Sequence, residues 1–406
     1  MIPRGAQNTL LSKLLHRSVV VLRALPRAGR TSLLVALTEE MGDGSELISA
    51  DDFVRSTHQH IQSVYCGRAV CVDAIQVAQV ARVESIIRSC AEHKQSAPKF
   101  ILVGRNAKVE QALCEALIGI ATEQELPPIQ VLEHLYDNKP LQTTQGPLST
   151  VAPQALSTNT YEWNKDALWL RGGLPESLNA ENDEESFVWR SDYLASLLNQ
   201  DLYCWGIDAS DRLPDVFQYV ANTNGEQFDD ANCSKILSVK RESIRKSLNL
   251  LERTGLIRRL PNWPAGSNHS LNCMPVFYVR DCGLLHAALG IRSMEHLRRH
   301  DALGHSWESF AIEAIATVTS GNATPAFYRD KEKNEIDLVL RFPGGVIYAI
   351  EIKVSSGAKA KKGFALGCDA VGATDRMVVH SDETDFFSDD GVPRLNLVSA
   401  LKRLPQ

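Results

Sequence analysis

Short apolar runs alternate with helix-length stretches from Ser18 to Leu135, and this alternation constrains the fold more than any other feature of the chain. The apolar runs cover 18–22, 47–49, 69–73 and 99–103, and stretches with helical spacing cover 31–40 and 77–93. Strands separated by helix-length crossovers form parallel sheets that helices cover on both faces. We therefore predict a multidomain α/β protein whose first domain, residues 1–142, has a parallel sheet with flanking helices.

A glycine-containing turn follows the first apolar run and opens the first predicted helix. This is the setting of the phosphate loop GxxxxGK[ST], whose backbone amides and lysine hold nucleotide phosphates. Here Ala24 replaces the first glycine, which has more freedom at positive φ, and Arg30 replaces the lysine. Arg30 keeps the positive charge, but its planar guanidinium differs in shape from the compact ammonium of a lysine. The candidate nucleotide-binding residues of this turn are Pro26, Arg27, Ala28, Gly29, Arg30 and Thr31.

Two more strands of this domain end in polar residues. Asp73 closes the run 69–73, where an acid can hold Mg²⁺ together with Thr31, and Asn106 follows the run 99–103, where a polar side chain can sense a γ-phosphate. Ala74 stands where many such ATPases have a glutamate that activates water. We expect weak or vestigial ATP binding with slow or no hydrolysis. The alternative is an α/β domain with an unrelated glycine turn.

A helical region follows a linker. Residues 143–165 are rich in Ser, Thr, Gln and Pro and predict the linker, and residues 166–285 show mostly helical spacing. Within them, about 228–262 has the helix-turn-helix-strand order of a winged helix. Four basic residues begin its second helix, the one that enters the DNA major groove in such motifs: Lys240, Arg241, Arg245 and Lys246. The alternative is a solvated charged face on a packing helix.

Acidic residues in the last domain, 286–406, suggest metal chemistry. Asp337 and Glu351 lie on two alternating strands joined by a predicted hairpin, and period two places Lys353 on the face of Glu351. Two carboxylates can hold Mg²⁺ or Mn²⁺ while Lys353 orients water or neutralises charge. Glu308, on the preceding helix, is a further acid. This order resembles the PD-(D/E)XK nuclease core, a restriction-endonuclease-like α/β domain; the alternative is a cross-strand salt-bridge ladder.

The order of these features resembles a bacterial and archaeal family that joins an AAA-type P-loop ATPase domain to a C-terminal domain of unknown function 4143. The resemblance rests chiefly on the turn 22–33, on Arg171-Gly172-Gly173-Leu174-Pro175, and on the segment 335–353. It implies an ATP-binding first domain and a winged helix joined to a nuclease-like domain. Ala24, Arg30 and Ala74 depart from the family pattern, so the resemblance does not carry ATPase activity over to this chain.

Composition limits the location and the partners. The net charge of −6 over 406 residues excludes wholesale coating of nucleic acid, so any basic surface is local. The nine cysteines are scattered, no apolar run is long enough to span a bilayer, and we expect a cytoplasmic protein without a membrane partner. The first 38 residues contain no acid but several arginines, which also occurs in transit peptides.

Three hypotheses remain open. The leading one is a DNA-associated protein with a degenerate ATP-binding domain and a Mg²⁺-dependent nuclease-like domain. The second is a non-catalytic nucleotide- or DNA-binding assembly protein, and the third is a working AAA-type ATPase. Homo-oligomerisation is compatible with each of them.

Overall fold

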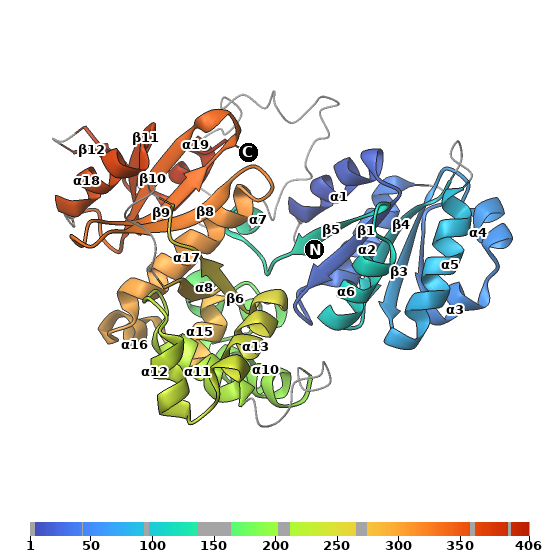
Figure 1. The fold of residues 1–406 in the computed structure, drawn as a ribbon, viewed down its shortest axis with the longest axis horizontal. Helices are drawn as coiled ribbons and strands as arrows, with labels where there is room; N and C mark the ends of the chain where they lie inside the picture. The colour runs from blue at the N-terminus through green and yellow to red at the C-terminus, as the bar shows by residue number, and fades with distance from the viewer. Residues whose placement is uncertain are drawn as a thin grey trace. The chain divides into compact units, whose positions relative to one another are not determined.

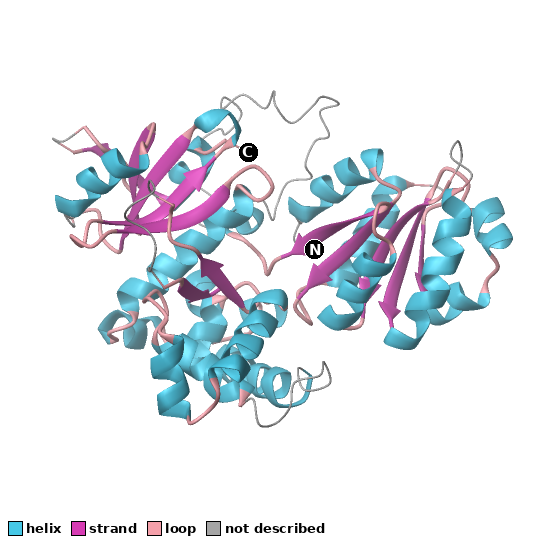
Figure 2. Cartoon of the chain, in the orientation of Figure 1, coloured by secondary structure: helices cyan, strands magenta, loops and turns pink. Residues whose placement is uncertain are grey.

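The computed structural model describes residues 5–42, 44–92, 97–135, 164–201, 212–264, 274–357, 362–388 and 391–405. The chain divides into two compact units, Met1–Pro140 and Leu141–Gln406 (Figure 1). Both units combine helices with a sheet (Figure 2), so the predicted multidomain α/β fold is confirmed. The predicted linker lies outside the described residues except for its end, where Asn164 caps a helix that begins at Lys165.

The first unit has a parallel sheet in the order β2-β3-β4-β1-β5. Its strands are β1 (Val19–Ala24), β2 (Glu46–Ser49), β3 (Ala69–Ile75), β4 (Lys99–Gly104) and β5 (Ala121–Leu126). The near-continuous burial of β1, β3 and β4 is typical of a sheet covered on both faces. Because the strands are parallel, the loops after β1, β3 and β4 open at one edge, where open α/β sheets bind ligands.

Helices cover both faces of this sheet (Figure 1). They are α1 (Gly5–His16), α2 (Arg30–Met41), α3 (Ala50–Arg55), α4 (His58–Val64), α5 (Val80–Ala91) and α6 (Ala107–Ala116), and a short helix, α7 (Val131–Leu135), follows β5. Helices α1 and α2 pack with Val20 and Leu22, whereas α3 to α6 pack with Val19 and Val21 on the opposite face. The predicted helix 77–93 is divided into a 3₁₀ turn, Val77–Gln79, and α5.

The second unit begins with helices. These are α8 (Lys165–Arg171), α9 (Pro175–Leu178), α10 (Asp183–Ser196) with a π-helical end (Leu197–Asp201), α11 (Leu213–Asn222), α12 (Asp230–Leu237) and α13 (Arg241–Arg253). An antiparallel pair, β6 (Ile257–Leu260) and β7 (Val276–Val279), follows α13. Helices α12 and α13 with this pair have the element order of the predicted winged helix.

The Arg-Gly-Gly-Leu-Pro segment follows α8 and lies where α8 and α10 pack against α15 (Cys282–Ala288). The carboxylate of Asp281 caps α15 at Leu284 N and accepts a second hydrogen bond, 2.9 Å long, from Gly173 N. The buried guanidinium of Arg190 donates to the carbonyls of Leu170 and Gly283. The segment is therefore a packing junction of the fold, held by buried polar groups.

A mixed sheet forms the rest of this unit, in the order β12-β13-β11-β10-β9-β8. Its strands are β8 (Thr324–Arg329), β9 (Glu335–Arg341), β10 (Ile347–Lys353), β11 (Asp375–His380), β12 (Phe386–Phe387) and β13 (Pro393–Asn396). The helices of this part are α16 (Met294–Arg299), α17 (Leu303–Val318), α18 (Lys362–Val371) and α19 (Leu397–Arg403). β9 and β10 form the predicted antiparallel hairpin. Among the described residues, no helix is long and apolar enough to cross a membrane.

Candidate functional site

The turn between β1 and α2 contains two residues with positive φ directly before the helix. Gly29 caps α2 in the left-handed conformation, with φ 92°, and Arg27 also has positive φ at 62°. Ala28 is buried beneath the turn. Ala24 is the last residue of β1 and does not have positive φ. The alanine at this position of the motif therefore causes no backbone strain in this conformation. The free amides at the start of a 12-residue helix favour an anion here.

Thr31 and Asp73 are brought together at this edge of the sheet. The Thr31 hydroxyl donates to Asp73 Oδ2 at 3.0 Å, and Ala74 N donates to Asp73 Oδ1 at 2.7 Å. A hydroxyl and a carboxylate are oxygen ligands of the kind that Mg²⁺ prefers. The pair therefore fits the divalent cation that accompanies a bound nucleotide. Ala74 is exposed and has φ 62°, and its methyl group offers no base for water.

Arg30 turns away from this position. Its Nη1 donates to Gly104 O at 2.9 Å and to Glu110 Oε1 at 3.1 Å. Glu110 lies on α6 with only 1% of its surface exposed, and burial raises the pKa of its carboxyl to about 8 against the opposing effect of Arg30. Sequence reasoning missed Glu110, because an acid on a helix eighty residues from the turn shows no motif.

The other predicted nucleotide contacts have local structural roles. The side-chain oxygen of Asn106 accepts the Val109 amide at 3.1 Å and caps α6, so this oxygen is engaged at the helix end. Pro26 is half-buried and Arg27 is exposed in the turn. The structure thus places Pro26, Arg27, Ala28, Gly29, Arg30 and Thr31 in one turn beside Asp73.

The predicted DNA-contacting residues lie at the start of α13. Lys240 caps the helix, and all four side chains are exposed. Arg245 donates twice to Asp230 Oδ2, at 2.9 and 2.7 Å, and Arg241 lies 3.9 Å from the same carboxylate. Lys246 is paired with Glu242 at 3.3 Å. The basic face is therefore partly neutralised by its own acids, although exposed pairs of this kind are weak and exchange readily.

The predicted acidic cluster lies where the pairing between β9 and β10 ends. Their ladder ends one residue short of Asp337, whose Oδ2 instead accepts the Ile352 amide at 2.7 Å. Lys353 Nζ lies 2.5 Å from Glu351 Oε1 and 3.6 Å from Asp337 Oδ2. Glu351 is fully buried and Asp337 is 8% exposed. Two acids and one ammonium thus meet as the strand spacing indicates.

Glu308 approaches the cluster from α17. Its Oε1 accepts the hydroxyl of Tyr278 at 2.5 Å, and His305 Nδ1 lies 3.6 Å from Oε2. Burial and then the charges of Glu308 and Glu351 raise the pKa of Asp337 well above its usual value, and the ammonium of Lys353 opposes them less strongly. The nearby carboxylate of Glu308 raises the pKa of His305. The acids of the cluster therefore repel one another, and this repulsion favours the protonated form of Asp337.

The donor set of this cluster suits Mg²⁺ or Mn²⁺, because both prefer carboxylate oxygens. Lys353, however, occupies the space between Asp337 and Glu351 as their counter-ion. Within the described ranges, no three His, Cys, Asp or Glu side chains come together in a way that would hold a metal ion. A divalent cation would have to displace the ammonium from the carboxylate pair.

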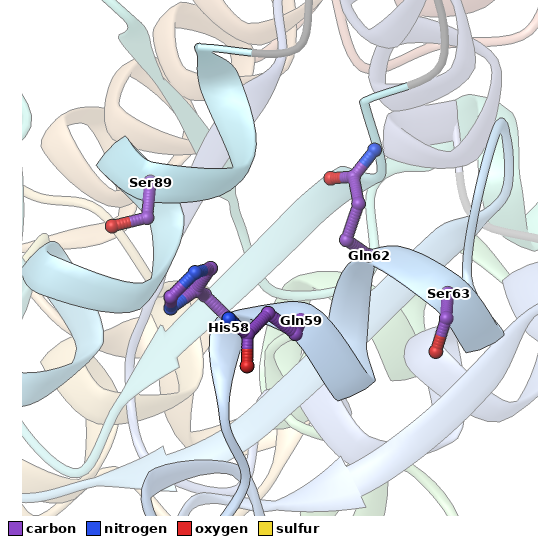
Figure 3. A pocket seen from close by; sticks show the side chains of 5 residues that line it. All are labelled: His58, Gln59, Gln62, Ser63 and Ser89. Atoms are coloured by element: carbon purple, nitrogen blue, oxygen red, sulfur yellow. The ribbon is translucent and has the colours of Figure 1, made fainter.

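A surface pocket of the first unit lies between α4 and α5 (Figure 3). Its lining side chains are His58, Gln59, Gln62, Ser63 and Ser89. None of the predicted site residues lines it. Amides and hydroxyls around one imidazole indicate no particular reaction.

Two family models match the second unit. Residues 163–295 match the Domain of unknown function (DUF8612), and residues 303–399 match the Domain of unknown function (DUF4143). The second match confirms the predicted C-terminal domain of unknown function 4143; it gives the domain and not its chemistry.

Curated and solved proteins similar to the chain are distant. Uncharacterized proteins of Mycobacterium tuberculosis and Mycobacterium bovis are each 27% identical over 368 residues, which is 88% of this chain and 75% of theirs. The Walker-type ATPase of Pyrococcus abyssi is 12% identical with a TM-score of 0.46, over 71% of this chain and 96% of that one. The DNA clamp loader delta protein of Bacillus subtilis is 11% identical with a TM-score of 0.27, over 61% and 88%.

Proposed function

We propose that the first unit binds a nucleotide with Mg²⁺ and hydrolyses it slowly or not at all. The observation that carries this proposal is the hydrogen bond between Thr31 and Asp73 beside the left-handed Gly29 at the start of α2. The helix end would hold phosphate oxygens through backbone amides, and Thr31 with Asp73 would hold the cation. Bound Mg²⁺ would neutralise part of the phosphate charge.

Slow turnover follows from the residues around this pair. Ala74 has no group that could take a proton from water, and the Arg30 fork is bonded to Gly104 O and Glu110 instead of facing the turn. A bound nucleotide would then act as a stable ligand. This supports an assembly or regulatory role for the first unit, as in the second hypothesis from the sequence.

Nucleotide binding and phosphate release test this proposal together. We expect saturable binding of ATP with Mg²⁺, loss of about tenfold or more in affinity in Asp73→Asn, and phosphate release near background. Ala74→Glu supplies the missing carboxylate at an exposed position and is expected to raise phosphate release. Wild-type release well above that of Asp73→Asn would instead favour the working ATPase.

We propose metal-dependent phosphodiester cleavage by the second unit as the second candidate. The observation that favours it is the gathering of three acids, Glu308, Asp337 and Glu351, around the single ammonium of Lys353. Asp337 and Glu351 would hold the cation, which would polarise the scissile phosphate. Lys353, once displaced from the pair, would be free to orient water or to stabilise charge, and Glu308 would be the further acid.

DNA is the proposed substrate, with contacts from Lys240, Arg241, Arg245 and Lys246 on α13. In a duplex cleavage assay with Mn²⁺, Asp337→Asn is expected to abolish cutting, and the exposed control Glu332→Gln to leave it unchanged. Arg245→Ala is expected to raise the DNA concentration for half-maximal cleavage a few-fold without altering the saturated rate, because a phosphate contact contributes to binding alone. If no duplex, single-stranded or branched DNA is cut, a non-catalytic DNA-binding role is favoured.

We also propose a cytoplasmic location. Cysteines 66, 71, 90, 114, 233, 282 and 368, those in the described part of the chain, are all free thiols, as a reducing compartment would leave them. Cell fractionation tests this directly.

A further inference from the structure

The salt bridge between Arg30 and Glu110 lies under the candidate phosphate-binding turn. Arg30 occupies the position of the phosphate-loop lysine, yet its Nη1 is shared by Gly104 O and Glu110 Oε1. Glu110 packs tightly on the end of β4, since a Cβ on Gly104 would lie 2.8 Å from Glu110 Cγ. The side chain of Glu110 is 2% exposed and that of Arg30 is 17% exposed. The cation at the lysine position of the turn is thus bonded to a buried acid.

The other charges around Glu110 do not replace Arg30. Arg23 of β1 faces the acid, but it is paired with Glu123 at 3.1 Å and lies 3.9 Å from Glu125, both on β5. Glu123 itself adds negative charge, and the thiol of Cys114 on α6 is a further titratable neighbour. Glu110 Oε2 has no hydrogen-bond partner among the described residues. If Arg30 turned toward a ligand, Glu110 would be a buried carboxylate with little compensation.

We infer that Glu110 is a positioning residue: it holds Arg30 away from the turn, and it releases Arg30 to a nucleotide phosphate only when its own carboxylate takes up a proton. This inference rests on the proposed nucleotide binding and assigns the control of that binding to Glu110. A buried carboxylate that loses the cation paired with it is stabilised by protonation. Binding of the anion and binding of one proton are therefore coupled.

The coupling has a defined direction. Burial raises the pKa of Glu110 to about 8 even with Arg30 in place, so below pH 8 the acid is already mostly protonated, and turning Arg30 toward a phosphate leaves no buried charge behind. Above pH 8, the carboxylate ionises and holds Arg30, and nucleotide binding must then draw a proton from solution. The affinity is expected to be flat below pH 8 and to fall by up to about tenfold per pH unit above it. Nucleotide phosphates are fully ionised there and do not titrate themselves.

Calorimetric titration of the full chain with MgATP at pH 7 and pH 9 tests the inference. In two buffers of different ionisation enthalpy, the wild type is expected to take up almost no proton at pH 7 and up to one at pH 9. This measurement needs no variant. Glu110→Gln mimics the protonated acid and is expected to bind at pH 9 as the wild type does at pH 7. Glu115→Gln, an exposed acid on the same helix, is the matched control and should keep the wild-type profile.

The outcomes separate the inference from the function on which it rests. Binding that has the same affinity at both pH values, with no proton uptake and no change in Glu110→Gln, would overturn the role of Glu110 and leave nucleotide binding intact. Binding by Glu110→Gln alone at pH 9 would support the inference. If neither protein binds MgATP at any pH, both the proposed function and the inference fail.

Discussion

Replacing Gly283 with alanine is expected to destabilise the second unit by about 3 kcal/mol. An added Cβ would lie 2.1 Å from the carbonyl oxygen of Arg171 and 2.5 Å from its carbon, and backbone atoms cannot move aside as a flexible side chain can. The same carbonyl accepts the hydroxyl of Ser177, and Arg190 bonds the neighbouring carbonyls. Any shift of α15 away from α8 would break these buried hydrogen bonds as well.

Urea unfolding followed by tryptophan fluorescence measures this loss. All six tryptophans follow residue 162, so the signal reports on the second unit alone. Gly304→Ala is the matched control, since Gly304 is also helical, with nothing within 4 Å of its added Cβ; it is expected to stabilise the unit by up to about 1 kcal/mol. A Gly283→Ala protein as stable as the wild type would mean that the Arg-Gly-Gly-Leu-Pro junction is not packed as described.

Replacing Lys353 with methionine is expected to cost the second unit about 3 kcal/mol or more at pH 7. The substitution keeps the apolar stem but removes the ammonium that lies 2.5 Å from Glu351 Oε1 and 3.6 Å from Asp337 Oδ2. Two buried acids then lose their shared cation, and Glu308 adds to the repulsion. Lys246→Met removes an exposed pair with Glu242 and is expected to cost less than about 0.5 kcal/mol.

The cost of Lys353→Met depends on pH with a definite sign. The pKa of Asp337 is already raised in the folded state, and loss of the ammonium raises it further. The folded variant therefore binds more protons than its unfolded chain, and its stability falls as pH rises above the ordinary carboxyl range. The difference from the wild type should be small near pH 4 and largest near pH 8. A difference that grows toward acid pH would contradict the ion-pair geometry.

The parallel sheet of the first unit was predictable because its strands are locally apolar and its crossovers are helix-length. The runs 69–73 and 99–103 match β3 and β4, and both strands lie in the sheet interior, where burial on two faces requires apolar residues throughout. β5 was not expected. Its sequence, Ala121–Leu126, is largely polar, and it becomes a strand by pairing with β1 at the edge of the sheet.

The candidate sites were predictable where the residues share an element or a motif. Period two along β10 indicated that Glu351 and Lys353 share a face, and the hairpin indicated that Asp337 lies near them. Partners distant in sequence gave no such signal. The bonds of Arg30 to Glu110 and of Glu308 to Tyr278 exist only because the folded chain brings separate elements together.

These unpredicted partners change how the sites are interpreted. The sequence presents Arg30 as a modified phosphate-loop cation and Arg245 as a DNA contact. In the structure each has an acid partner, Glu110 for the former and Asp230 for the latter. The first pair is buried and restricts its arginine strongly once Glu110 is ionised, whereas the second is exposed and restrains its arginine weakly.

Magnesium-dependent binding of a non-hydrolysable ATP analogue tests the central claim most directly. The account predicts saturable binding that weakens about tenfold or more when Mg²⁺ is chelated, and equally in Thr31→Val, which keeps the side-chain shape and removes the hydroxyl bonded to Asp73. Thr38→Val, on the same helix with its hydroxyl bonded to Val35 O, should bind as the wild type does. A wild-type protein without saturable binding at millimolar analogue, or a Thr31→Val protein that binds normally, would contradict the account.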